Sequence, residues 1–142
     1  MIDAMQILDL HLERQTIAFL ATVERAGDLP PPSLLVLVAD ETGRVVLPVA
    51  VDEVPDDPPQ DERISALAAL LEQITEFGRP PGVAMAISRH GDPRPRGSDF
   101  GWHDALAQCC RVAHVTCYGT YVATPYGVRR VRPSPAPDLL AA

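Results

Sequence analysis

Lysine and asparagine are absent from the 142-residue chain, and all twelve basic residues are arginine. Without lysine, a Walker-type phosphate-binding lysine and a Schiff-base lysine are excluded. Cysteine is scarce as well. Of Cys109, Cys110 and Cys117, two are adjacent and the count is odd, which argues against a disulfide framework. The abundance of Ala, Arg, Pro, Gly and Val is typical of a GC-rich bacterial genome.

Long apolar runs are also missing, and none approaches the roughly 18–20 residues that a membrane span needs. The first residues, MIDAMQILDLHLER, lack the basic start and apolar stretch of a secretory signal. We therefore expect a cytoplasmic protein with no membrane partner. Apolar residues make up 46% of the chain, which is a globular composition. The length suits a single domain over residues 1–142.

Charge is distributed unevenly along the chain. The net charge of −7 combines −10 in residues 1–80 with +3 in residues 81–142. An acidic surface argues against sequence-blind binding of nucleic acid. We therefore expect a protein partner in preference to a nucleic acid, and the sequence leaves open a homodimer in which the N-terminal helix packs across the interface.

Hydrophobic periodicity predicts an α/β (α+β) fold, with a mixed sheet flanked by about three helices. Pro48 cannot donate a backbone hydrogen bond, so its strand should bulge or lie at an edge. We expect an N-terminal helix within residues 1–28, a core over 33–131 and a loose Pro/Ala-rich tail over 132–142. The predicted elements are helix 3–26, strands 33–40 and 44–51, helix 63–77, strand 82–88, helix 99–112 and strands 115–124 and 128–131.

One loop carries the most information, because GDPRPRGSD (residues 91–99) follows a predicted strand and opens a predicted helix. Its Gly-Asp-Pro-x-Pro sequence, with Asp99 four residues after Pro95, resembles the signature of the RadC-like branch of the JAB/JAMM metallopeptidase superfamily. The likeness extends over residues 33–131. It implies a sheet architecture related to cytidine deaminases. It also implies a zinc site made by two histidines and an aspartate, with a glutamate that positions water.

Most of that site is missing when the signature is transferred to this chain. Asp99 takes the place of the metal-binding aspartate, but the two histidine positions fall on Ala86 and Ser88. The glutamate position falls near Val49, and the nearest acid is Glu53. The resemblance therefore implies a pseudoenzyme: a non-catalytic domain that binds an unidentified protein partner and needs no cofactor.

A rearranged metal site is the alternative. Asp99 and His103 stand at i and i+4 on one helix face, and His90 lies on the preceding loop. Together they would offer zinc three ligands, as in a metal-dependent, isopeptidase-like hydrolase. Against this, Asp99 also suits a helix cap, and both histidines suit surface positions.

Two groups of arginines form candidate binding residues: Arg89, Arg94 and Arg96 on one loop, and Arg129, Arg130 and Arg132 near the last strand. If the sheet brings the two groups together, they would grip an anion, a phosphate or an acidic partner. Alternatively, they would pair with the acidic loop over residues 52–62. The cysteines could act as nucleophiles with His103 or His114 as the base, but no orienting group is evident and buried apolar positions suit them.

Overall fold

Residues 8–76, 78 and 81–132 are described by a computed structural model of the chain. Its elements are α2 (Glu13–Arg25), β1 (Ser33–Ala39), β2 (Val45–Asp52), α3 (Gln60–Thr75), β3 (Gly82–Ser88), α4 (Gly97–Ala113), β4 (Thr116–Thr124) and β5 (Gly127–Val131). The strands form one sheet in the order β2-β1-β3-β4-β5. Strands β3 and β4 run parallel, and the other neighbours are antiparallel. The predicted combination of a mixed sheet with three helices is confirmed within this part of the chain.

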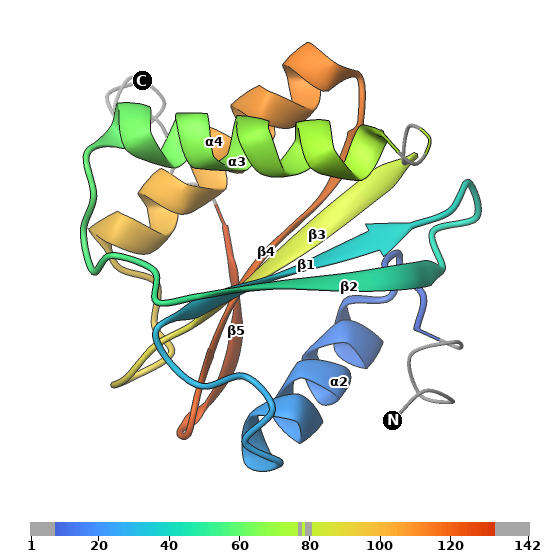
Figure 1. Cartoon of the computed structure of the whole chain (residues 1–142). Helices are drawn as coiled ribbons and strands as arrows, with labels where there is room; N and C mark the ends of the chain where they lie inside the picture. Colours follow the sequence, from blue (N-terminus) through green and yellow to red (C-terminus); the bar gives the residue numbers. More distant parts are fainter. Residues whose placement is uncertain (1–7, 77, 79–80, 133–142) are drawn as a thin grey trace, which may run out of the picture.

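The sheet is covered on both faces. Helices α3 and α4 lie on one face and α2 lies on the other (Figure 1). Met85 and Trp102 belong to the core beneath α3 and α4, whereas Leu20 and Tyr121 belong to the core beneath α2. Strands β1 and β3 are buried at every position, which explains why their sequences are continuous apolar runs.

Pro48 lies in β2, which is an edge strand of the sheet. It pairs with Leu37 of β1, and the register shifts nearby, between Val38 and Ala39. Both features agree with the prediction from Pro48. Proline has no amide hydrogen to donate to a neighbouring strand, and at a sheet edge one side of the strand has no neighbour that needs one.

The N-terminal helix begins later than predicted, at Glu13. Leu8 and Leu10 are both buried, and the segment around them follows the β1–β2 turn in extended form. The amide of Val45 donates to Leu8 O at 3.0 Å, and the amide of Leu10 donates to Gly43 O at 2.8 Å. Leu8 and Leu10 are two residues apart and both point into the core, which happens in extended backbone and not in a helix. The helix predicted over residues 8–12 is therefore wrong. Residues 3–7 of that prediction lie outside the described part.

The division into residues 1–28, 33–131 and 132–142 stays a prediction. Of the tail, only Arg132 lies in the described part, where it is exposed, and the remainder lies outside. In residues 8–76, 78 and 81–132, no helix has the length and apolar character needed to cross a membrane.

Candidate functional site

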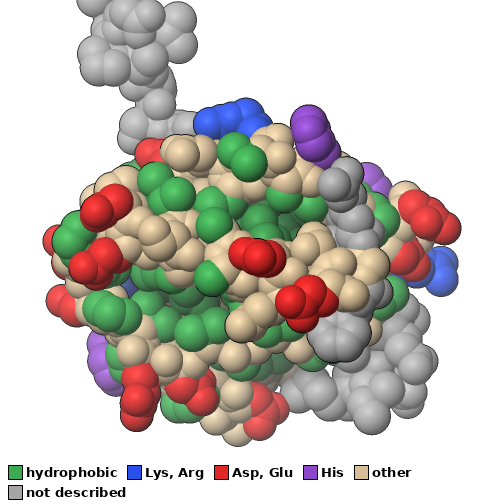
Figure 2. All heavy atoms as spheres, turned by 45° about the horizontal axis from the view of Figure 1, so that its top comes forward, with side chains coloured by type: hydrophobic (Ala, Val, Ile, Leu, Met, Phe, Trp, Pro, Cys, Tyr) green, Lys and Arg blue, Asp and Glu red, His purple; other side chains and the backbone are tan. Residues whose placement is uncertain are grey.

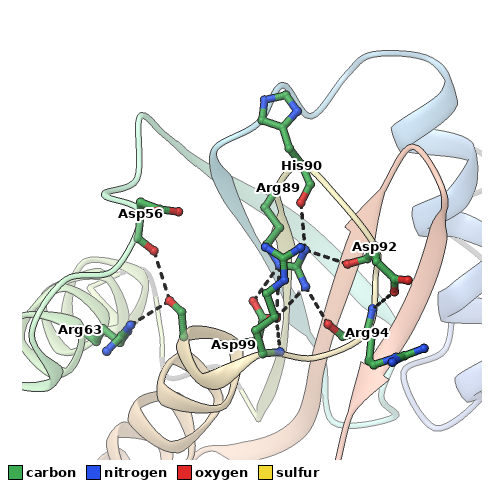
Figure 3. Close-up of polar contacts among 9 residues, drawn as sticks. Asp56, Arg63, Arg89, His90, Asp92, Arg94 and Asp99 are labelled. Atoms are coloured by element: carbon green, nitrogen blue, oxygen red, sulfur yellow. Dashed lines mark hydrogen bonds and ion pairs between the residues drawn. The ribbon is translucent and has the colours of Figure 1, made fainter.

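The loop between β3 and α4 folds around the guanidinium of Arg89 (Figure 3). Its Nη1 donates to the carbonyl oxygens of His90 at 2.9 Å and Asp92 at 2.8 Å, and its Nη2 donates to that of Arg94 at 2.9 Å. Nε and Nη2 also reach the Asp99 carboxylate, at 3.2 and 2.9 Å. The donor groups of Arg89 are therefore engaged inside the loop, which makes this residue an organiser of the loop.

Asp99 completes the same arrangement from the first turn of α4. It is only 1% exposed, and its Oδ2 also accepts the backbone amide of Arg96 at 2.8 Å. A buried carboxylate needs such partners, because desolvation of an unpaired charge is costly. Asp99 therefore caps α4 and neutralises Arg89. It does so from the third helical position, with Arg96 as the N-cap, whereas the sequence suggested Asp99 itself as the cap residue of a helix that begins two residues later.

The positions that the metallopeptidase resemblance singled out do not converge. Ala86 packs into the core beneath α2, and Ser88 donates to Leu29 O at 2.8 Å on that same side. Asp99 lies on α4, which covers the opposite face of the sheet. The side chains at positions 86 and 88 therefore point away from α4. Ser88 borders one hollow together with Asp99, but Ala86 does not line that hollow.

The rearranged zinc site is not assembled either. His90 is exposed on the loop, whereas Nδ1 of His103 lies 2.9 Å from Thr120 Oγ1 of β4. Burial lowers the pKa of His103. Across the described ranges 8–76, 78 and 81–132, no three His, Cys, Asp or Glu residues gather as a metal site would require.

The acidic loop over residues 52–62 is paired with α3 rather than with the predicted arginines. Arg63 donates through Nη2 to Asp57 Oδ1 at 2.6 Å and to Ser98 Oγ at 2.8 Å. Its guanidinium also lies 5.7 Å from the ring centroid of Trp102. In the part of the chain that the structure describes, no ion pair joins this loop to either arginine group.

The thiols are buried or half-buried, as predicted for small apolar residues. Cys109 donates to Ile64 O at 3.4 Å, and burial raises the pKa of its thiol. A hydrogen bond from Cys110 lowers the pKa of Cys117 to about 7. His114, a predicted base, is exposed at the left-handed C-cap of α4, with φ of 58°.

The two arginine groups meet at the outer edge of β5. A hollow of about 460 Å³ opens between this strand, the loop before α4 and the start of α2. We call it the arginine hollow, and it is lined by Glu13, Ile17, Arg94, Pro95, Phe100, Val128, Arg129, Arg130 and Arg132. Four arginines and one acid thus line the hollow, which gives it a local charge of +3.

Glu13 holds two of these arginines. Its carboxylate accepts from Arg130 Nη1 and Arg132 Nη2, each at 2.9 Å, and these partners lower the pKa of Glu13. Arg130 also donates to Tyr118 O at 3.1 Å. Arg94 and Arg129 are exposed and form no ion pair with another described residue. Their guanidinium groups remain available to an incoming anion.

Arg89 and Arg96 lie elsewhere, in a second hollow of about 220 Å³ between the end of β3, the loop before α3 and the start of α4. Asp56, Asp57 and Asp99 line it too, so acids offset its bases. The six predicted binding arginines are therefore divided: Arg94, Arg129, Arg130 and Arg132 line the arginine hollow, whereas Arg89 and Arg96 do not.

Neither a family model nor a curated protein matches the chain. Four solved chains do match. One is T. thermophilus RuvC in complex with a Holliday junction substrate, which is 17% identical with a TM-score of 0.31, over 57% of this chain and 50% of that one. Another Thermus thermophilus RuvC structure is 20% identical with a TM-score of 0.33, over 66% and 57%. The chain thus spans little more than half the length of RuvC, and at such TM-scores the likeness carries no weight for fold or activity.

These findings correct the metallopeptidase interpretation. No family model supports it, and the described part of the chain holds no group of residues that could form its metal site. The identification as a degenerate RadC-like JAB/JAMM domain is therefore wrong, and so is the pseudoenzyme function that followed from it. The isopeptidase-like alternative fails with it, because His90, Asp99 and His103 do not form a metal-binding group.

Proposed function

We propose that the chain binds a phosphate-bearing anion in the arginine hollow. One observation carries the proposal: four arginines from segments far apart in the sequence line one concave surface against a single acid. In a chain with a net charge of −7, a local charge of +3 is a marked reversal. Such a reversal attracts and orients an anionic ligand.

The kind of basic residue favours phosphate. A planar guanidinium offers parallel N–H groups that match two phosphate oxygens, and it stays charged at any physiological pH. Arg94 and Arg129 line the hollow from different elements, the loop before α4 and β5, and we expect both to contact a bound phosphate.

Apolar side chains complete the hollow. Phe100, Pro95 and Val128 lie beside the arginines. An aromatic ring next to guanidinium groups is suited to a nucleotide, because the ring can stack on the base while the guanidinium groups pair with the phosphate. The favoured ligand is therefore a nucleotide unit, supplied either by a free nucleotide or by a single-stranded nucleic acid.

Calorimetric titration tests this proposal. The wild-type chain is titrated with pyrophosphate, with ATP and with a short single-stranded oligonucleotide at low and high salt. We expect saturable binding that salt weakens. ATP binding tighter than pyrophosphate would support a role for Phe100, and preference for the oligonucleotide over ATP would identify nucleic acid as the source.

Variants locate the site. Arg94→Gln and Arg129→Gln should each weaken binding by about tenfold, the effect of losing a charge-assisted hydrogen bond of about 1.5 kcal/mol. Arg111→Gln removes an exposed arginine of α4 outside the hollow and should leave binding unchanged. Absence of binding by all three ligands, or equal effects of the three variants, would overturn the proposal.

A further inference from the structure

A second surface feature is an apolar groove between α3 and α4, on the face away from the sheet. It encloses about 370 Å³. Helix α4 crosses behind α3 in Figure 1, and the two are joined where Gln60 Nε2 donates to Gly101 O at 2.8 Å. The groove is lined by Ile64, Ala68, Leu71, Glu72, Thr75, Gln108, Cys109, Val112 and Ala113.

Val112, at the rim of this groove, is a large apolar side chain that is 77% exposed. Ala68 beside it is exposed too. A large apolar side chain left this open, at the rim of a concave apolar surface, is the arrangement found where a partner docks. Burial of Val112 by a partner would remove apolar surface from water, which is favourable.

Acidic side chains border the groove. On α3, Asp61 lies on the same side as Ala68 and Glu72, and Glu76 follows on that side at the C-cap. On α4, Asp104 lies on the same side as Gln108 and Val112. All these carboxylates are exposed, and Arg111 is the only exposed base on the two helices. In Figure 2 the hydrophobic side chains in the middle of this face are bordered by acidic ones.

We infer that this groove docks an amphipathic helix of a protein partner that carries basic residues on either side of its apolar face. A groove between two helices accepts a third helix through apolar residues at i, i+3, i+4 and i+7. The acidic border selects arginine or lysine flanks and rejects acidic ones. This surface is separate from the arginine hollow and does not depend on anion binding.

A second copy of the chain is the less suitable occupant. In a twofold dimer the same surface would face itself. Asp61, Glu72 and Asp104 of one copy would then lie against those of the other, and like charges disfavour such an arrangement.

The test uses a synthetic helical peptide with leucines at i, i+4 and i+7 and arginines on both flanks. Its twin carries glutamate in place of each arginine. Backbone amide NMR of the full chain should show shifts on α3 and α4, with binding of the arginine peptide at least about tenfold tighter than that of its twin.

Val112→Glu should weaken peptide binding by at least about tenfold. Its exposure makes a folding defect unexpected, and unchanged amide spectra of the sheet would verify the fold. Val46→Glu is the matched control, since Val46 is 58% exposed on β2, and it should bind the peptide normally.

Equal binding of the two peptides, shifts outside α3 and α4, or normal binding by the Val112→Glu variant would each overturn the inference. So would a dimer of the wild-type chain in sedimentation that Val112→Glu dissociates, because the groove would then take a second copy.

Discussion

Replacing Glu13 with glutamine is expected to strengthen anion binding in the arginine hollow. The Glu13 carboxylate occupies Arg130 and Arg132 at 2.9 Å, so an incoming phosphate competes with it for these donors. The side chain of Glu13 is 34% exposed and that of Arg132 is 67% exposed. Partly solvated ion pairs of this kind contribute about 0.2–1 kcal/mol each.

The two pairs share one carboxylate, so their contributions do not add in full. Loss of about 1 kcal/mol of competition corresponds to roughly fivefold tighter binding. The same substitution should lower the free energy of unfolding by no more than about 1 kcal/mol. Both effects should shrink at high salt, because the groups are partly exposed.

Calorimetry with pyrophosphate and urea unfolding of the same samples provide the assay. Glu41→Gln is the matched control, since Glu41 is an exposed acid on the β1–β2 turn and does not line the hollow. Its pyrophosphate affinity should equal that of the wild type. Unchanged or weaker binding by the Glu13→Gln variant would refute the idea that this carboxylate competes with the ligand.

Three further results are expected. Asp99→Asn should destabilise the fold in urea by about 3–5 kcal/mol, because it leaves Arg89 without its buried counter-charge; a loss below about 1 kcal/mol would contradict the organising role of this pair. Iodoacetamide should alkylate Cys117 with a midpoint near pH 7, the pKa to which its hydrogen bond lowers it, and a midpoint near that of a free thiol would contradict this. Burial raises the pKa of Glu24 above its unfolded value, so its contribution to stability is lost as pH rises through the folded pKa. Glu24→Gln should therefore exceed the wild type in stability at neutral pH, and equal pH profiles of unfolding would contradict that.

Local patterns predicted much of the fold. The apolar run at residues 33–40 corresponds to β1, which is covered on both faces, and Pro48 indicated an edge strand. The N-terminal helix was predicted too long because Leu8 and Leu12 fit helical spacing, whereas Leu8 and Leu10 in fact pair with the β1–β2 turn. Their backbone partners, Val45 and Gly43, are distant in sequence, so tertiary pairing overrides the local pattern.

The candidate site was predicted less well, since its contacts are non-local. A short motif suggested a metal centre, but the faces to which residues 86, 88 and 99 point depend on strand alternation and helix placement. Arginine-rich loops indicated an anion site, yet only the folded chain shows that Arg89 is engaged by the loop carbonyls. Glu13 is 117 residues from Arg130, and no local signal links them.

A crystal structure of the chain grown with tungstate would test the central claim most directly, because the heavy atom of this phosphate-like anion is located by its anomalous scattering. Our account predicts tungstate in the arginine hollow, within hydrogen-bond distance of Arg94 and Arg129. Tungstate bound only in the smaller hollow beside Arg96, or absent from both hollows at saturating concentration, would contradict it.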